Sequence, residues 1–255
     1  MTILVIGDII GEPGRKAVRR LLPDLFREFD IQLVIGNGEN SAGGLGITLT
    51  TARELFDSGI DVITTGNHIW AKKEIIPYLD GDLAILRPLN YPPTNPGRGY
   101  LFKDKVLVVN LVGRTFMNSL DCPFRAMDDL LDRLEGNPRI VVVDFHAEAT
   151  SEKIAMGRYL DGRVSAVLGT HTHVGTIDAQ ILSGGTAYVT DIGMCGPVDS
   201  VIGDDADSVI KRFLTQMPIR LVVGKGAVGF DAMLVELNEE TGKALDIKRI
   251  RRIVD

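Results

Sequence analysis

Six short runs rich in Val and Ile recur along the chain, and they constrain the fold more than any other feature. They occupy residues 3–7, 31–36, 61–66, 106–113, 139–145 and 164–169. Because these runs are apolar at consecutive positions, each strand is expected to be buried on both faces. Amphipathic helical patterns separate several of the runs, at residues 15–29, 50–58, 125–134 and 151–160. This alternation predicts an α/β fold built on a largely parallel or mixed sheet.

The remainder of the chain adds irregular structure and antiparallel pairs. Residues 87–100 are too rich in Pro and Gly for regular structure, so we expect a long surface loop there. Apolar runs on both sides of Gly184-Gly185 and of Gly242 predict two hairpins, and with them a second sheet stacked on the first. The chain has 255 residues, 45% of them apolar, and no repeat or linker interrupts it. We therefore expect a single domain over residues 1–255.

Charge and cysteine content exclude several classes of protein. The net charge of −6 gives no general attraction for long nucleic acid or for an anionic membrane. No apolar stretch approaches the ~18 residues of a membrane span and no leader precedes the first apolar run, so we expect a cytoplasmic protein. The C-terminal "KRIRRIVD" is typical of a charge-blunted edge strand, which we favour over a nucleic-acid patch. Cys122 and Cys195 lack CxxC spacing, which argues against a disulfide framework and a thiolate metal site.

Polar side chains stand where five of the predicted buried strands end. They are Asp8, Glu39, Asn40, Asn67, His68, His146, His171 and His173, and they include all four histidines of the chain. The carboxyl ends of strands face the ligand crevice in open α/β sheets, so we expect these residues to converge on one place. Taken singly, each residue also has a structural explanation. Asp8 and Asn67 could cap the helices that follow them, and His68 could be a polar residue at a helix start.

The donor atoms in this group are oxygens and imidazole nitrogens without thiolates, a set that suits Mn, Fe, Zn or Ni. Apart from His68 the donors number seven, more than one ion needs. Two ions about 3.5–4 Å apart that share a carboxylate would use them all, and such a pair stabilises the attacking and leaving oxygens of phosphoryl transfer. Glycines nearby would let the backbone approach the ions and a phosphate, namely Gly36, Gly38, Gly43, Gly44 and Gly46.

A dinucleotide-binding turn is a competing interpretation of the first strand and helix. Gly7, Gly11 and Gly14 follow a predicted strand and precede a predicted helix. Their spacing is GxxxGxxG instead of GxGxxG, and Asp8 would repel a pyrophosphate that carries no metal. An oxidoreductase of this kind would bind NAD(P) even after treatment with a chelator.

Several motifs resemble those of one superfamily. "GD" at 7–8, "GNH" at 66–68 and "GTHTHV" at 169–174 are similar to motifs of the metallophosphoesterase, or calcineurin-like, superfamily. "GDIIGEPGR", "GNGENSAGGLGIT", "TTGNHIW", "DCPF", "DFHAEATSEK" and "GTHTHVGT" extend the resemblance, over nearly the full length, to the YmdB-like bacterial phosphodiesterases. The resemblance implies a four-layer α/β sandwich of two stacked mixed β-sheets flanked by helices. It also implies a centre of two metal ions, Fe or Mn, with Zn or Ni as further candidates.

The same resemblance implies a role for each polar residue at the strand ends. One ion would be held by Asp8, Glu39, Asn40 and His173, and the other by Glu39, Asn67, His146 and His171. Glu39 is then the bridge, and His68 would face the phosphate as proton donor. Ile10 and Ile69 stand where the wider superfamily has a histidine and often an acidic partner, so the group that orients His68 is left open.

These observations lead to the hypothesis of a metal-dependent phosphodiesterase that acts on small phosphodiesters, with 2′,3′-cyclic nucleotides as the substrates that the resemblance implies. A hydroxide that bridges the two ions would attack phosphorus, and His68 would protonate the leaving oxygen. Phe116, Met117 and Phe124 offer a pocket wall for a base, although core packing explains them better. A phosphomonoesterase with the same centre, or a metal-loaded regulatory protein, is the alternative, and assembly into a homo-oligomer is left open.

Overall fold

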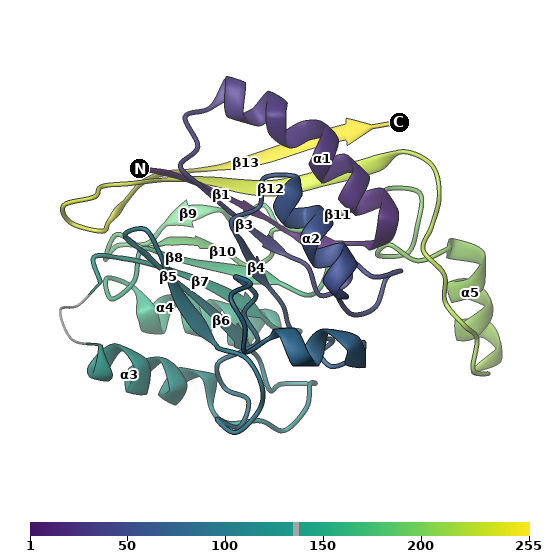
Figure 1. The fold of residues 1–255 in the computed structure, drawn as a ribbon, viewed down its shortest axis with the longest axis horizontal. Coiled ribbons are helices and arrows are strands. Elements are labelled where there is room, and N and C mark those ends of the chain that lie inside the picture. Colours follow the sequence, from purple (N-terminus) through teal and green to yellow (C-terminus); the bar gives the residue numbers. More distant parts are fainter. Residues whose placement is uncertain (135–137) are drawn as a thin grey trace.

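The computed structural model describes residues 1–134 and 138–255, and within them two β-sheets lie face to face between helices (Figure 1). The first sheet contains β1 (Thr2–Ile6), β2 (Asp8–Ile9), β3 (Leu33–Asn37), β4 (Val62–Thr64), β11 (Met194–Pro197), β12 (Val228–Leu237) and β13 (Ala244–Val254). Its strand order is β2-β11-β12-β1-β3-β4, and β13 pairs with β12. Strand β1 is parallel to β3 and antiparallel to β12, so this sheet is mixed.

The second sheet is also mixed and has a parallel centre. It contains β5 (Tyr100–Lys103), β6 (Val106–Val112), β7 (Ile140–His146), β8 (Ala166–Thr170), β9 (Gln180–Ile181) and β10 (Ala187–Val189). Strands β6, β7, β8 and β10 run parallel, whereas β5 and β9 pair antiparallel at the two edges. The carboxyl ends of the parallel strands therefore meet at one edge of the sheet.

Helices cover the outer face of each sheet. The helices of the described residues are α1 (Gly11–Glu28), α2 (Leu49–Asp57), α3 (Pro123–Arg133), α4 (Thr150–Leu160) and α5 (Ala206–Thr215), with a 3-10 helix η1 (Lys73–Tyr78). Helices α1 and α2 lie on the first sheet and α3 and α4 on the second, while α5 stands apart at one end (Figure 1). The order helix, sheet, sheet, helix confirms the expected stacking of two mixed sheets flanked by helices.

The continuous apolarity of the strands follows from this layering. In β1, Ile3 and Val5 belong to the core between the two sheets, whereas Leu4 and Ile6 pack toward α1 and α2. Successive side chains of a strand point to opposite faces, so a strand between two cores needs apolar residues at every position. The six strands predicted from Val and Ile runs are all present, within a few residues of their expected limits.

The predicted hairpins form where expected, but they do not build a separate sheet. The turn at Gly184-Gly185 joins β9 to β10, which extends the second sheet beside β8. The turn at Gly242 joins β12 to β13. This hairpin belongs to the first sheet, where β12 pairs with β1. Apolar runs show that a strand is buried on both faces, but they do not tell which of two sheets it enters. The first sheet therefore combines N-terminal and C-terminal strands, whereas the second is built from the middle of the chain.

The Pro-rich segment 87–100 is irregular, as predicted, but its first part is buried. The side chain of Asn90 donates to the carbonyls of Val112 and Asp121, both at 2.9 Å, and accepts from the Val112 amide. Buried backbone groups need hydrogen-bond partners, and the Asn90 side chain provides them for the backbone of Val112 and Asp121. Tyr91 is buried next to it and packs edge-on against Trp70. The expectation of a surface loop is thus wrong for residues 87–91.

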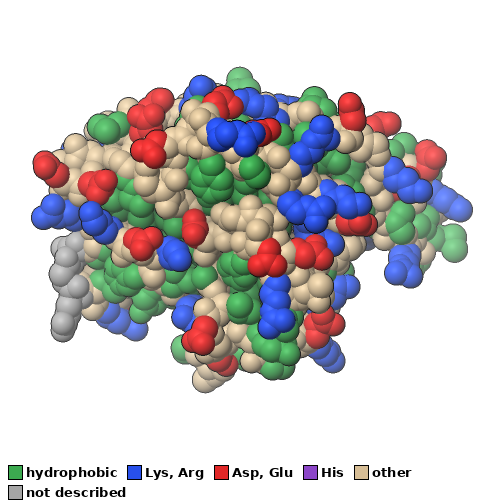
Figure 2. Space-filling view, turned by 45° about the horizontal axis from the view of Figure 1, so that its top comes forward, with side chains coloured by type: hydrophobic (Ala, Val, Ile, Leu, Met, Phe, Trp, Pro, Cys, Tyr) green, Lys and Arg blue, Asp and Glu red, His purple; other side chains and the backbone are tan. Residues whose placement is uncertain are grey.

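The C-terminal strand β13 lies at an edge, where it pairs only with β12 among the strands of the described residues. Its cations have local partners: Arg249 is 3.1 Å from Asp231, and Arg252 is 3.0 Å from Glu28. On the face shown in Figure 2, Lys and Arg are interspersed with Asp and Glu. The blunted-edge interpretation of "KRIRRIVD" therefore accounts for these charges. In the part of the chain described, no helix is long and apolar enough to cross a membrane.

Candidate metal centre

Residues from both sheets meet at one edge of the molecule. Strand β1 leads to Asp8, β3 to Glu39 and Asn40, and β4 to Asn67 and His68, all from the first sheet. Strand β7 ends at His146 and β8 leads to His171 and His173, from the second sheet. Contacts of 3.0 to 3.6 Å link these residues into one cluster. The structure thus brings together all eight residues that the sequence singled out.

Three electron-pair donors crowd around one ring nitrogen of His146. Its Nε2 lies 3.0 Å from Glu39 Oε1, 3.0 Å from Asn67 Oδ1 and 3.0 Å from His171 Nδ1. A ring nitrogen carries at most one proton, so hydrogen bonding satisfies at most one of these neighbours. Donor atoms of Glu39, His146 and His171 all lie within 4.8 Å of one another. This arrangement fits a cation held among the four side chains.

The opposite nitrogen of His146 has a fixed partner. Its Nδ1 lies 3.0 Å from Thr170 Oγ1, and that hydroxyl donates in turn to Asp144 Oδ1 at 2.6 Å. Because the single hydroxyl proton goes to the carboxylate, Thr170 accepts from His146, and the proton of the ring is on Nδ1. The lone pair of Nε2 then points to the cluster, as in histidines that bind metals. Burial raises the pKa of Asp144 to about 6.

A second group of donors surrounds Asp8. Its Oδ1 is 3.6 Å from His173 Nε2, and Asn40 Nδ2 is 3.3 Å from the same ring nitrogen. His173 Nδ1 donates to the carbonyl of Ile202 at 2.7 Å, so its Nε2 is the ring nitrogen that faces the cluster. The Asn40 oxygen faces His68, so Asn40 binds an ion beside His173 through oxygen only after its amide turns over. Asp8 can bind a cation as it stands, whereas His173 binds one when its Nε2 gives up its proton.

Two buried carboxylate oxygens in the cluster lack hydrogen-bond donors. Among the described residues, three buried side-chain atoms have no such partner, and two of them are Asp8 Oδ1 and Glu39 Oε1. An unpaired buried charge is costly, and a bound cation removes that cost. Burial acts to raise the pKa of Asp8 and of Glu39, but the neighbouring histidines outweigh burial and hold both pKa values below their ordinary range. Both groups are therefore anionic, and the residues fit a metal centre.

The histidines of the cluster differ in their affinity for a proton. Burial, with the nearby charge of His146, lowers the pKa of His171 to about 3. Burial also acts to lower the pKa of His173, but the Asp8 carboxylate outweighs it and raises the pKa to about 9. The proton on His173 thus occupies the place that a cation would take beside Asp8.

His68 is held by two neighbours from the β3 end. Its backbone amide donates to Glu39 Oε2 at 2.9 Å, and its Nδ1 lies 2.9 Å from Asn40 Oδ1. Since an amide oxygen only accepts, Nδ1 is the donor and Nε2 is free to face the cleft. Asn40 therefore orients His68, which answers the question that Ile69 left open.

The cluster lies at the bottom of a cleft of about 770 Å³. Five charged residues of its wall were not predicted from the sequence, namely Lys72, Glu148, Asp204, Arg212 and Arg220. Glu148 Oε2 is 3.0 Å from His171 Nε2. The sequence signal for Glu148 was its position two residues after His146, which places it at the end of the same strand. The cations come from segments without any motif, so the sequence offered no comparable signal for them.

A buried ion pair supports the loop that carries His171 and His173. Both histidines have positive φ, at 99° and 64°, a backbone region that costs energy for residues other than glycine. Between them, the amide and hydroxyl of Thr172 donate to Asp191 Oδ2 at 3.1 and 2.8 Å. The same oxygen accepts from Lys153 Nζ at 2.6 Å, and this pair is almost fully buried. The surrounding bonds therefore hold the strained loop in place.

Glycines near the centre serve different purposes. Gly43 and Gly44 line the cleft with φ of 69° and 88°, as their predicted role requires. A Cβ at Gly66 would overlap the ring of His146, so the "GNH" motif needs glycine for close packing. At Gly36 and Gly38 a Cβ would instead meet core isoleucines, so core packing accounts for these two.

Two other expectations concern residues away from the cleft. A Cβ at Gly14 would overlap the Cys195 carbonyl of β11, so the glycine pattern of α1 is explained by packing without a dinucleotide. Phe116 is 89% exposed, and Phe124 packs edge-on against Tyr159. Neither they nor Met117 line the cleft around the cluster. The pocket-wall interpretation of this segment is therefore not supported.

Comparisons with known proteins agree with this geometry. The family model described as YmdB-like protein matches residues 4–250. A 2′,3′-cyclic-nucleotide 2′-phosphodiesterase of Bacillus subtilis (strain 168) is 45% identical over 254 residues, 98% of this chain and 96% of that protein. The crystal structure of a hypothetical protein from Thermus thermophilus has a TM-score of 0.93 at 44% identity and covers 99% of both chains. That of a novel phosphatase from Mycoplasma pneumoniae has a TM-score of 0.93 at 32% identity, covering 99% of this chain and 93% of the other. The chain therefore belongs to the YmdB-like protein family.

Proposed function

We propose that this protein is a metal-dependent phosphodiesterase that hydrolyses small phosphodiesters, with 2′,3′-cyclic nucleotides as its substrates. The observation that carries the proposal is the crowding of lone pairs around His146 Nε2, beside two buried carboxylate oxygens without donors. Similarity to the Bacillus subtilis phosphodiesterase supports the substrate class.

Two metal ions, Fe or Mn, are proposed for the centre, with Zn or Ni as further candidates. Asp8, Glu39, Asn40 and His173 would hold one ion. Glu39, Asn67, His146 and His171 would hold the other. When bound, the ions would lower the pKa of water and neutralise charge on the phosphoryl group.

The residues of this chain then have distinct tasks in the reaction. A water oxygen gives up one proton to solvent and forms the new bond to phosphorus, while the bond from phosphorus to the ribose 2′ oxygen breaks. His68 lines the cleft and would give a proton from its ring to that leaving oxygen. Lys72, Arg212 and Arg220 line the same cleft and attract the anionic phosphate.

The decisive test combines metal analysis with an activity assay. We expect about two ions per chain by elemental analysis. We also expect hydrolysis of adenosine 2′,3′-cyclic phosphate that EDTA abolishes and added Mn²⁺ restores. Undiminished hydrolysis after complete removal of metal would contradict the proposal. A metal-loaded protein that cleaves no phosphoester would favour a regulatory role instead.

A phosphomonoesterase with the same centre is the second candidate, and its support is the similarity to the Mycoplasma pneumoniae phosphatase. The two activities are separated by comparing bis-p-nitrophenyl phosphate with p-nitrophenyl phosphate. A higher kcat/KM for the monoester would favour the second candidate. A higher kcat/KM for the diester supports the first.

A further inference from the structure

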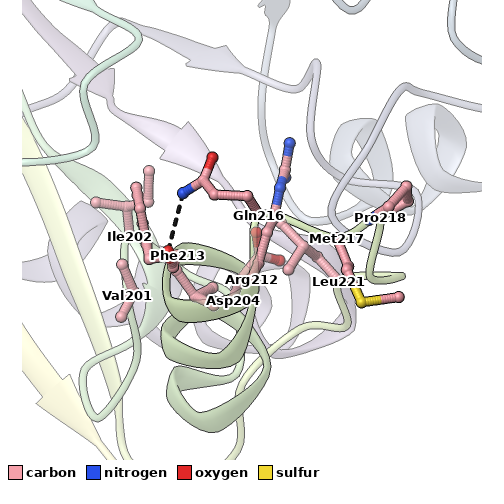
Figure 3. A pocket seen from close by; sticks show the side chains of 10 residues that line it. Val201, Ile202, Asp204, Arg212, Phe213, Gln216, Met217, Pro218 and Leu221 are labelled. Atoms are coloured by element: carbon pink, nitrogen blue, oxygen red, sulfur yellow. Dashed lines mark hydrogen bonds between the residues drawn. The ribbon is translucent and has the colours of Figure 1, made fainter.

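An apolar cavity lies beside α5, away from the donors of the metal centre. Its volume is about 630 Å³, within the range of sites that take small molecules. Its apolar wall is formed by Val201, Ile202, Val209, Phe213, Met217 and Leu221, most of them labelled in Figure 3. Asp204, Arg212 and Gln216 supply polar atoms at its margin, and Gln216 donates to the Phe213 carbonyl at 2.8 Å.

The cavity adjoins the cleft of the proposed metal centre. Ile202, Asp204, Arg212 and Leu221 line both spaces. Ile202 also ties the two together through its backbone, because its carbonyl accepts from Nδ1 of His173 at 2.7 Å. A molecule whose phosphate lies among the donors therefore has the apolar cavity beside it, across the residues that line both spaces.

The chemistry of the two spaces is divided. The cleft contains the anion-binding groups, namely the proposed metal ligands with Lys72, Arg212 and Arg220. The cavity is lined mainly by apolar side chains, among them Phe213, and three polar side chains, Asp204, Arg212 and Gln216, complete its lining. A ligand that suits both spaces has an anionic group at one end and a flat, weakly polar group at the other.

We infer that the α5 cavity receives the nucleobase of the substrate whose phosphate is bound at the metal centre. This inference rests on the proposed phosphodiesterase function and names the subsite that selects nucleotides among phosphodiesters. The ring of Phe213 offers a stacking surface that tolerates any base. Arg212, at the junction, stands between the subsite for the base and the subsite for the phosphate.

The test compares a nucleotide with a matched substrate that lacks a base. Adenosine 2′,3′-cyclic phosphate and methyl riboside 2′,3′-cyclic phosphate share the reacting group. For Phe213→Ala, we expect KM for the adenosine compound to rise about tenfold with kcat nearly unchanged, since base stacking contributes an effect of this order. KM for the methyl riboside should not change. Leu214→Ala is the matched control, because Leu214 is 80% exposed on the same helix and lies outside the cavity.

A filling variant and a binding measurement complete the design. Val201→Trp should exclude the base, so it should raise KM for the adenosine compound alone. By calorimetry, Phe213→Ala should weaken binding of adenosine 3′-phosphate about tenfold and leave binding of inorganic phosphate unchanged.

Several results would overturn the inference. Equal effects of Phe213→Ala on both substrates, or none on either, would exclude a base subsite while leaving the proposed function intact. A change from dimer to monomer in light scattering, with both substrates affected alike, would make the α5 surface an interface between two copies. If the Mn²⁺-loaded wild-type protein hydrolysed neither compound, the proposed function would fail together with the inference.

Discussion

At the scale of single residues, each of three histidines in the cluster has one ring nitrogen fixed and the other free. Thr170 fixes His146, the Ile202 carbonyl fixes His173, and Asn40 fixes His68. The fixed nitrogen holds a proton, so the other ring nitrogen of His146 and of His173 faces the carboxylates and can bind a cation once it carries no proton. Partners of this kind orient metal ligands and commonly set their affinity.

Thr170→Val is expected to weaken metal binding without unfolding the protein. The substitution keeps the shape of the side chain but removes the acceptor for His146 Nδ1 and a donor to Asp144. We expect Mn²⁺ affinity, measured by calorimetry, to fall about 10- to 100-fold. Thr186→Val is the control, because Thr186 is equally buried but its hydroxyl donates to the Val164 carbonyl, away from the cluster. Equal Mn²⁺ affinity in the two variants would contradict the role of Thr170.

His68 and Asn67 are adjacent in the chain, yet their substitution should have different consequences. His68→Ala should keep both ions and lower kcat by about 10²- to 10⁴-fold, because it removes only the proton donor. Asn67→Ala removes the oxygen that lies 3.0 Å from His146 Nε2, so this variant should lose one ion. Elemental analysis beside steady-state kinetics distinguishes the two variants. Full activity of His68→Ala would show that another group supplies the proton.

The two thiols are expected to differ in reactivity. Burial raises the pKa of Cys195, and the thiolate is the reactive form, so Cys195 should be inert in the native protein at pH 8. Cys122 is only half-buried. Titration with Ellman's reagent should therefore detect one thiol in the folded protein and two in guanidinium chloride. Rapid reaction of both thiols in the native state would contradict this burial.

The sequence predicted which residues come together in the cluster but not what supports them. The eight residues stand at strand ends, so a general rule about parallel sheets was enough to bring them together. Asp144, Thr170 and Asp191 act through hydrogen bonds and ion pairs with side chains from other strands and loops. The spacing of residues along the chain does not indicate such contacts. Asp144 left only a faint trace, as a polar residue two positions before His146 in an otherwise apolar strand.

At the scale of elements, α4 is joined to the loop between β10 and β11 by the buried pair of Lys153 and Asp191. Lys153→Met leaves the Asp191 carboxylate buried without its cation, which should lower the free energy of unfolding by about 3–5 kcal/mol. Lys16→Met removes an exposed pair with Glu12 on α1 and should cost about 0–1 kcal/mol. Urea unfolding followed by circular dichroism measures both. A loss no larger than that of the control would show that Asp191 is adequately held by its remaining donors.

Elements were predicted well where burial dictates the residues, and less well elsewhere. The strands and α1 to α4 pack against a core, so their apolar periodicity was visible in the sequence. Helix α5 was missed because little of it contacts a core: Val209 is buried, whereas Phe213 and Leu214 are exposed. The side chain of Asp205 accepts from the Ser208 amide and caps α5, and this is the signal that was available.

At the scale of the whole molecule, the path of the chain interlocks the two sheets. The chain builds β1 to β4, passes to the second sheet for β5 to β10, and returns to the first for β11 to β13. The metal centre likewise takes residues from the ends of both sheets. The first sheet is complete only after the chain has built the second sheet and returned, so we propose that residues 1–255 form a single domain.

This topology predicts one cooperative unfolding transition. Trp70 packs edge-on against Tyr91 in the core between the first sheet and its helices, so its fluorescence reports on that layer. Circular dichroism reports on the strands and helices of both sheets. If the sheets unfold together, urea curves from the two probes will coincide in midpoint and slope. A fluorescence midpoint that differs from the dichroism midpoint would mean that one sheet survives without the other. The centre, which draws ligands from both sheets, would then be lost at the earlier transition, and Mn²⁺ should raise that midpoint selectively.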